Sequence, residues 1–118
     1  TAGIRALIRV VGFSETADLL FTARRVPAND ARHIGLVNEV YAKDLLDEAV
    51  DHVAHTIASN APLTIRSAKM TLQELAKLET ERDLDRIRDS IEACYQSDDF
   101  KEGVRAFLEK RKAEFKGR

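Results

Sequence analysis

The sequence predicts a mainly α-helical chain with at most one short strand, near Leu36–Val40. Three observations lead to this fold class. Apolar residues recur every three or four positions through most of the chain, which is the spacing that places them on one face of a helix. The two prolines and five glycines are few, and they fall at the ends of these periodic stretches. Charged residues make up 33% of the chain and gather opposite the apolar stripes, as in helices packed side by side.

Two helices are expected before residue 23. Apolar residues share one side of the stretch from Ala2 to Val11, and Gly12 then stops the helix. Ser14 can accept a hydrogen bond as the N-cap of a second helix from Glu15 to Thr22. Both stretches are more evenly apolar than the rest of the chain, so we expect them to need a neighbouring structure for their burial.

Residues 26–40 are expected to form a short helix, a glycine stop and a brief apolar run. Pro27 has its φ angle fixed for a first helical turn, and Gly35 can take the left-handed conformation that ends a helix. His33 lies just before that end, where the helix dipole favours a cation, so we interpret it as a capping residue. The β-like run that follows is too short to form a sheet alone and contains Leu36, Val37 and Val40.

Four longer helices are predicted in the second part of the chain. The first extends from Asp44, its N-cap, to about Ser59, and the second from Pro62 to about Lys77. The third covers about Glu79 to Tyr95, and the last begins after an N-cap at Asp98 or Asp99. Their apolar stripes are narrow, so we expect the helices to pack side by side or against a partner. The stripe of the first of these helices consists of Leu46, Val50, Val53 and Ile57.

Composition excludes several classes of function. A net charge of −1 argues against a dedicated nucleic-acid or membrane-surface protein, and no apolar run is long enough for a transmembrane helix. The single cysteine, Cys94, excludes an internal disulfide and fits a reducing compartment, so a cytoplasmic location is expected. The first residue is Thr1 and no signal-peptide pattern follows it, which favours a truncated or processed chain.

Candidate metal-binding and nucleophilic residues are present in a weak arrangement. Glu48, His52 and His55 share one helix face at spacings that could hold a metal ion. That face lies opposite the apolar stripe, so we interpret it as a solvated surface and predict no metal site. Cys94 lies on a packing stripe and has no evident base, so we interpret it as a small hydrophobic residue.

The C-terminal region is basic. Seven basic and three acidic residues occur between Lys101 and Arg118, and the cluster Lys110–Lys112 suits phosphate groups. The alternative is a solubilising helix end, where cations are favoured by the helix dipole. Both interpretations stay open on the residues alone.

Four segments, in order, resemble the enoyl-CoA hydratase/isomerase (crotonase) family. The most informative is FTARRVPANDARHIGLVNEV at residues 21–40, with its short helix and Gly-Leu-Val. The segment at residues 2–12 is similar to a family motif but departs from it at Ala2 and Ile4. The others are IASNAP at residues 57–62 and SDDFKEGVRAFLEKRK at residues 97–112, followed by Phe115.

The resemblance implies the C-terminal helical region of a crotonase-like fold. Residues 1–43 would end the family's core, and residues 44–118 would form the helical region that makes trimer contacts and covers coenzyme A (CoA). Family members bind acyl-CoA thioesters and stabilise an enolate in an oxyanion hole of two backbone N–H groups. These groups and the catalytic glutamates lie upstream of the matched region. We therefore expect no catalytic residue in this chain, no activity from it alone, and no cofactor beyond the CoA of the substrate.

One site residue follows from the resemblance. Lys110 falls at a motif lysine that reaches the CoA nucleotide in some members, whereas Ile91 stands where some members place an aromatic residue against adenine. The expected partners are the acyl-CoA substrate and further copies of the parent, as a trimer or dimer of trimers. A non-catalytic helical assembly module, or a parent with isomerase or decarboxylase activity, is the alternative.

Overall fold

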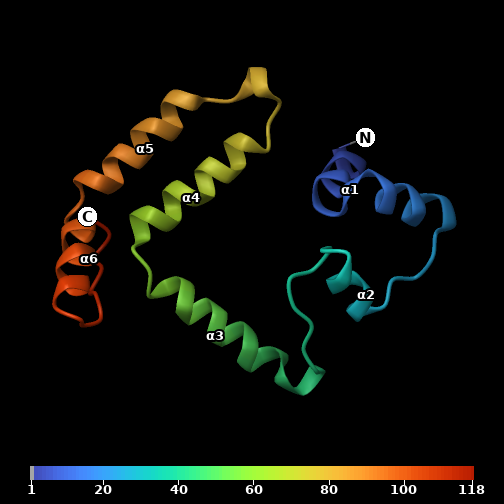
Figure 1. The fold of residues 1–118 in the computed structure, drawn as a ribbon, viewed down its shortest axis with the longest axis horizontal. Coiled ribbons are helices and arrows are strands. Elements are labelled where there is room, and N and C mark those ends of the chain that lie inside the picture. Colours follow the sequence, from blue (N-terminus) through green and yellow to red (C-terminus); the bar gives the residue numbers. More distant parts are fainter. Residues whose placement is uncertain (1) are drawn as a thin grey trace. The chain divides into compact units, whose positions relative to one another are not determined.

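The computed structural model describes residues 2–118, and these are largely helical (Figure 1). No residue in this range forms a β-strand, so the predicted mainly α class is confirmed. Two 3₁₀ turns accompany the α-helices, η1 (Lys43–Leu45) and η2 (Glu79–Glu81). The α-helices are α1 (Ala2–Thr22), α2 (Ala28–His33), α3 (Leu46–Ala58), α4 (Pro62–Leu75), α5 (Leu84–Gln96) and α6 (Asp98–Leu108).

The brief β-like run expected at Leu36–Val40 forms bends at residues 36–38 and irregular backbone at residues 39–40 instead of a strand. The backbone N–H groups of Leu36 and Val37 both donate to the carbonyl of Ala31, at 2.8 and 3.3 Å, and so close the end of α2. Gly35 has φ +78°, the left-handed conformation expected of it. Hydrogen bonds that could have paired a strand are thus used locally to end a helix.

The first helix is interrupted where the sequence predicted a stop. Gly12 has φ 83° and ψ 170° inside α1, so two helical pieces meet at a kink. The Thr16 hydroxyl donates to the Gly12 carbonyl at 2.7 Å and is buried. After the second piece, Ala23 has φ 49°, and the Arg24 guanidinium bonds back to Glu15 and Asp18 at 2.7 and 2.8 Å.

Two later helices begin differently from the prediction. Asp44 lies within η1 and makes no cap, because the residue before that turn is Ala42 and no side chain bonds there. Helix α5 starts after Asp83, whose side chain accepts from Arg86 N at 2.8 Å, and not near Glu79. Three acidic residues, Glu79, Glu81 and Asp83, precede α5 within five positions, and only the backbone conformation selects the one that caps it.

The N-cap of α6 is Ser97, not Asp98 or Asp99. The Ser97 hydroxyl accepts from Phe100 N at 3.0 Å and donates to the Cys94 carbonyl at 2.7 Å. The same side chain therefore ends α5 and starts α6. Both aspartates lie in the first turn of α6, where a negative charge is favoured by the helix dipole.

The chain divides into two compact units, residues 1–47 and residues 48–118. In the second unit, α4 and α5 lie side by side and α6 packs against α5 (Figure 1). Among residues 2–118, the only buried apolar side chains are Ala31 and Ala106. None of the described helices is long and apolar enough to cross a membrane.

A buried carboxylate joins the two ends of the α4–α5 connection. Glu74 is 2% exposed, and its oxygens accept from Lys77 Nζ at 2.7 and 2.8 Å and from Asp83 N at 3.1 Å. The Lys77 bond, the Asp83 N–H bond and the charges of Lys77 and Arg86 lower the pKa of Glu74 despite its burial. This residue fixes where α4 ends and where α5 can begin.

Candidate functional site

Helix α6 ends in a Schellman turn that places Lys110 in a left-handed conformation. The N–H of Lys110 donates to Phe107 O at 3.2 Å, and the N–H of Arg111 donates to Ala106 O at 3.0 Å. Lys110 has φ 54°, a region that glycine adopts easily and that a side chain disfavours. The predicted site residue is thus held, exposed, at the C-terminal end of α6.

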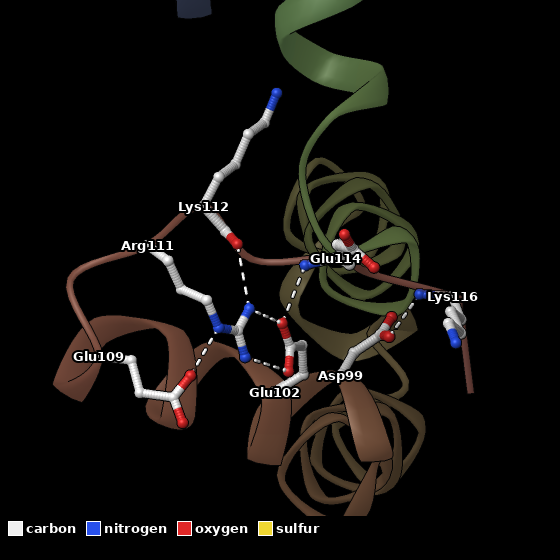
Figure 2. A network of polar contacts seen from close by, with 7 residues as sticks. All are labelled: Asp99, Glu102, Glu109, Arg111, Lys112, Glu114 and Lys116. Carbon is white, nitrogen blue, oxygen red and sulfur yellow. Dashed lines mark hydrogen bonds and ion pairs between the residues drawn. The ribbon is translucent and has the colours of Figure 1, made fainter.

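The neighbouring Arg111 is bound within the chain, as Figure 2 shows. Its guanidinium donates to both oxygens of Glu102 at 2.6 and 3.0 Å and to Glu109 at 2.6 Å. The Arg111 bonds, followed by a bond from Glu114 N, lower the pKa of Glu102 to about 2. The same carboxylates raise the pKa of Arg111 further above its ordinary value. Arg111 is therefore already neutralised by protein carboxylates.

A second carboxylate on α6 holds the last residues of the chain. Asp99 is buried and accepts from Lys116 N at 2.6 Å (Figure 2). It also accepts from Gly117 N at 2.8 Å. Its own N–H donates to the carbonyl of Arg118 at 3.1 Å. Asp99 and Glu102 are three residues apart on one helix face, so together they fix the C-terminal tail, residues 109–118, on α6.

Two cations of the predicted basic cluster stay outside this network. Among residues 2–118, neither Lys110 nor Lys112 forms an ion pair with a carboxylate. The Lys112 side chain points away from Glu102 and Arg111 in Figure 2. The cluster therefore presents two lysine ammonium groups to solvent, with a neutralised arginine between them.

An apolar groove of about 880 Å³ lies between α4, α5, α6 and the tail. The Phe115 ring from the tail forms part of its wall and lies against Gly103, where an added Cβ would be 3.6 Å away. Tyr95 and Phe100 meet edge to face with their ring centres 5.2 Å apart. Cys94 and Ile91 also line this groove, which suits an apolar surface or chain.

The histidines of α3, considered from the sequence as metal ligands and set aside, lie on an exposed helix. Within residues 2–118, no three His, Cys, Asp or Glu side chains lie close enough to hold a metal ion. His55 Nδ1 is 2.7 Å from Asp51 O, and His52 and Glu48 are exposed on the same helix.

Sequence reasoning missed the carboxylates that organise the tail. Asp99 was expected only as a possible N-cap, and Glu102 only as one of three acidic residues in the basic C-terminal region. The available signal was their spacing of three residues on a helix followed directly by a basic tail. Their contacts span 9 to 18 residues, so helix periodicity alone does not reveal them.

Comparison with known proteins supplies the family. A family model described as enoyl-CoA hydratase/isomerase matches residues 1–118. The chain belongs to the enoyl-CoA hydratase/isomerase family. The match agrees with the sequence resemblance and covers both compact units.

Curated relatives and solved structures of the family agree with this assignment. Methylmalonyl-CoA decarboxylase of Escherichia coli K12 is 38% identical over 117 residues, which are 98% of this chain and 45% of the relative. Short-chain-enoyl-CoA hydratase of Clostridioides difficile is 35% identical over 105 residues, 89% of this chain and 68% of the relative. The enoyl-CoA hydratase structure from Bacillus anthracis matches with a TM-score of 0.86 and 33% identity, over 98% of this chain and 45% of that one. The chain thus spans about half the length of most of these proteins, and the matched part is their C-terminal portion.

Proposed function

We propose that this chain is the assembly and CoA-covering part of an enzyme that acts on acyl-CoA thioesters as a hydratase or isomerase. The observation that carries the proposal is the family match across residues 1–118, together with relatives named for reactions of CoA thioesters. The oxyanion hole that stabilises the thioester enolate would lie in the part of the full-length protein outside these residues. Residues 1–43 would complete the enzyme core, and residues 44–118 would form the helical cover. A cytoplasmic location is part of this proposal.

Lys110 is the residue that we assign to the CoA nucleotide. It is exposed, it has no carboxylate partner within residues 2–118, and the end of α6 holds it in a left-handed conformation. Disfavoured backbone conformations persist where the surrounding structure enforces them, and they are common at binding sites. A lysine ammonium there would meet a phosphate as a compact point charge.

Assembly is the second part of the proposed role. The apolar stripe on α3 is about half exposed, with Leu46 at 46%, Val50 at 55%, Val53 at 49% and Ile57 at 50%. Such a stripe is stabilised when it packs against another surface. The rest of the parent or further copies, as a trimer or dimer of trimers, would supply that surface.

A decarboxylase is a second candidate activity for the parent. The 38% identity to methylmalonyl-CoA decarboxylase favours it, because a decarboxylation would use the same stabilised thioester enolate. Initial rates of the full-length protein with crotonyl-CoA and with methylmalonyl-CoA distinguish the two. A protein that acts on neither substrate and on no other acyl-CoA would instead be a non-catalytic assembly module.

The Lys110 assignment is tested with Lys110→Ala in the full-length protein. We expect the Kd for free CoA to rise about tenfold, the loss of one charge-assisted hydrogen bond, with little change in kcat. Lys101→Ala is the control, because it removes a lysine of α6, the helix that precedes Lys110, and Lys101 is paired with Asp98 at 3.2 Å. An unchanged Kd and an unchanged KM would exclude this role of Lys110.

A further inference from the structure

We infer that Glu102 is a positioning residue for the CoA site, acting through Arg111 to hold the turn that carries Lys110. The inference rests on the proposed role of Lys110. It extends that role to a residue on the previous turns of α6, one that would not touch the ligand.

The Glu102 carboxylate holds the segment that follows Lys110 at two points. Glu102 accepts two bonds from the Arg111 guanidinium and a third from Glu114 N at 3.0 Å. Arg111 in turn donates to the Lys112 carbonyl at 3.1 Å (Figure 2). The chain is therefore fixed immediately after Lys110 and again before it reaches Phe115. The Glu102 side chain is 17% exposed and that of Arg111 is 38% exposed, so the pair is partly shielded from water.

The turn needs such support because its backbone conformation is disfavoured. Two hydrogen bonds, from Lys110 N and Arg111 N, close the end of α6, and they hold a lysine where glycine is preferred. If the Arg111 guanidinium loses its bonds to Glu102, the backbone at Lys110 can leave the left-handed conformation. The direction in which the Lys110 side chain leaves the backbone is then no longer fixed. A ligand would then have to order the turn as it binds, which lowers its affinity.

Simple electrostatics predicts the opposite effect of removing Glu102. A carboxylate near a phosphate site repels the ligand, and it also neutralises Arg111, which could otherwise bind phosphate. Loss of the carboxylate would then tighten CoA binding. The sign of the change in affinity therefore distinguishes positioning from a charge effect.

The first test compares Glu102→Gln with Asp98→Asn in the full-length protein, with free CoA in calorimetry. Both variants remove one negative charge from α6, but Asp98 is 70% exposed and, among residues 2–118, forms an ion pair only with Lys101. We expect Glu102→Gln to raise the Kd by about three- to tenfold with kcat little changed, and Asp98→Asn to leave the Kd unchanged or lower. Equal or tighter binding by Glu102→Gln overturns the inference.

A second variant breaks the same contact without changing the net charge, and its melting temperature shows whether the protein is still folded. Arg111→Lys retains the positive charge but cannot form the two-pronged contact with Glu102. We expect it to weaken CoA binding to the same degree as Glu102→Gln, with the melting temperature measured beside it. Unaltered affinity in Arg111→Lys contradicts the inference.

A double-mutant cycle shows whether Glu102 acts through Lys110. In the Lys110→Ala background, Glu102→Gln should cause no further loss of CoA affinity. If the fold-losses of CoA affinity in Glu102→Gln and Lys110→Ala multiply in the double variant, Glu102 acts independently of Lys110. That result overturns the inference and leaves the Lys110 assignment intact. If Lys110→Ala alone leaves the Kd unchanged, the Lys110 assignment fails and this inference fails with it.

Discussion

Lys110 combines a disfavoured backbone conformation with a proposed binding role, so its substitutions separate stability from affinity. Lys110→Gly should raise the free energy of unfolding by about 0.5–1 kcal/mol, because glycine adopts the left-handed region freely and this gain exceeds its added unfolded-state entropy. The same variant should lose CoA affinity as Lys110→Ala does. Urea unfolding and calorimetry check the two effects. A Lys110→Gly protein of lower stability than Lys110→Ala would contradict this account of the turn.

The ion pair of Glu102 predicts a pH dependence of stability. The folded-state pKa of about 2 lies below the ordinary value of 4.5, so the unfolded chain binds more protons between these pH values. The stabilisation is complete above about pH 4.5 and is lost as the pH falls towards 2. Glu102→Gln should therefore show a shallower acid loss of stability in urea titrations between pH 5 and 2. Parallel curves for the two proteins would exclude this contribution.

Single residues differ in how far the sequence reveals their conformation. Gly35 takes the left-handed conformation expected of it, and Gly12, expected only as a helix stop, also has a positive φ angle, which glycine adopts freely. Lys110 and Ala23 do so too, at φ 54° and 49°, and nothing in their residue types indicates it. Their conformation comes from hydrogen bonds that close a helix end, so it is visible only in the folded backbone.

Among the elements, the junction of α5 and α6 depends on one hydroxyl. Ser97→Ala would remove the bond from Phe100 N and the bond to Cys94 O, and Ser97 is buried. We expect a loss of about 1–2 kcal/mol in the free energy of unfolding. Ser97→Asp, which restores a capping acceptor, should recover part of it. A loss below a few tenths of a kcal/mol in Ser97→Ala would show that the junction does not need the cap.

Helix positions were more predictable than helix starts. Periodicity located α4, α5 and α6 because apolar stripes extend over their whole lengths. The predicted starts of α3 and α5 were wrong. Asp44 and Glu79 are residues that can begin an α-helix, but here they lie in 3₁₀ turns that precede α3 and α5. In α5 the decisive contact is the bond from Asp83 N to the buried Glu74, which joins two helices and leaves no periodic signal.

For the molecule as a whole, the thin apolar core predicts association of the isolated 118-residue chain. Large apolar side chains on α3 are about half exposed, including Val53 at 49%. Sedimentation should show a mass above that of the monomer at high concentration. Val53→Glu should shift it towards monomer, whereas His52→Glu, on the exposed polar face of the same helix, should not. A clean wild-type monomer at high concentration would contradict the prediction.

The candidate site was only partly predictable at this scale. The family resemblance pointed to Lys110, but the sequence could not indicate that Arg111 is neutralised or that Asp99 holds residues 116 and 117. These contacts depend on how the tail returns along α6. Of the three basic residues at 110–112, the two lysines have ammonium groups without a carboxylate partner among residues 2–118, and the Arg111 guanidinium is bound to Glu102.

Turnover of a short enoyl-CoA tests the central claim most directly. Initial rates with crotonyl-CoA are measured for the full-length protein and for the purified 118-residue chain at equal molar concentration, with methylmalonyl-CoA as the second substrate. We predict turnover of one of these thioesters by the full-length protein and none by the 118-residue chain, because we propose that the oxyanion hole lies outside these residues. Robust turnover by the 118-residue chain alone would contradict the account.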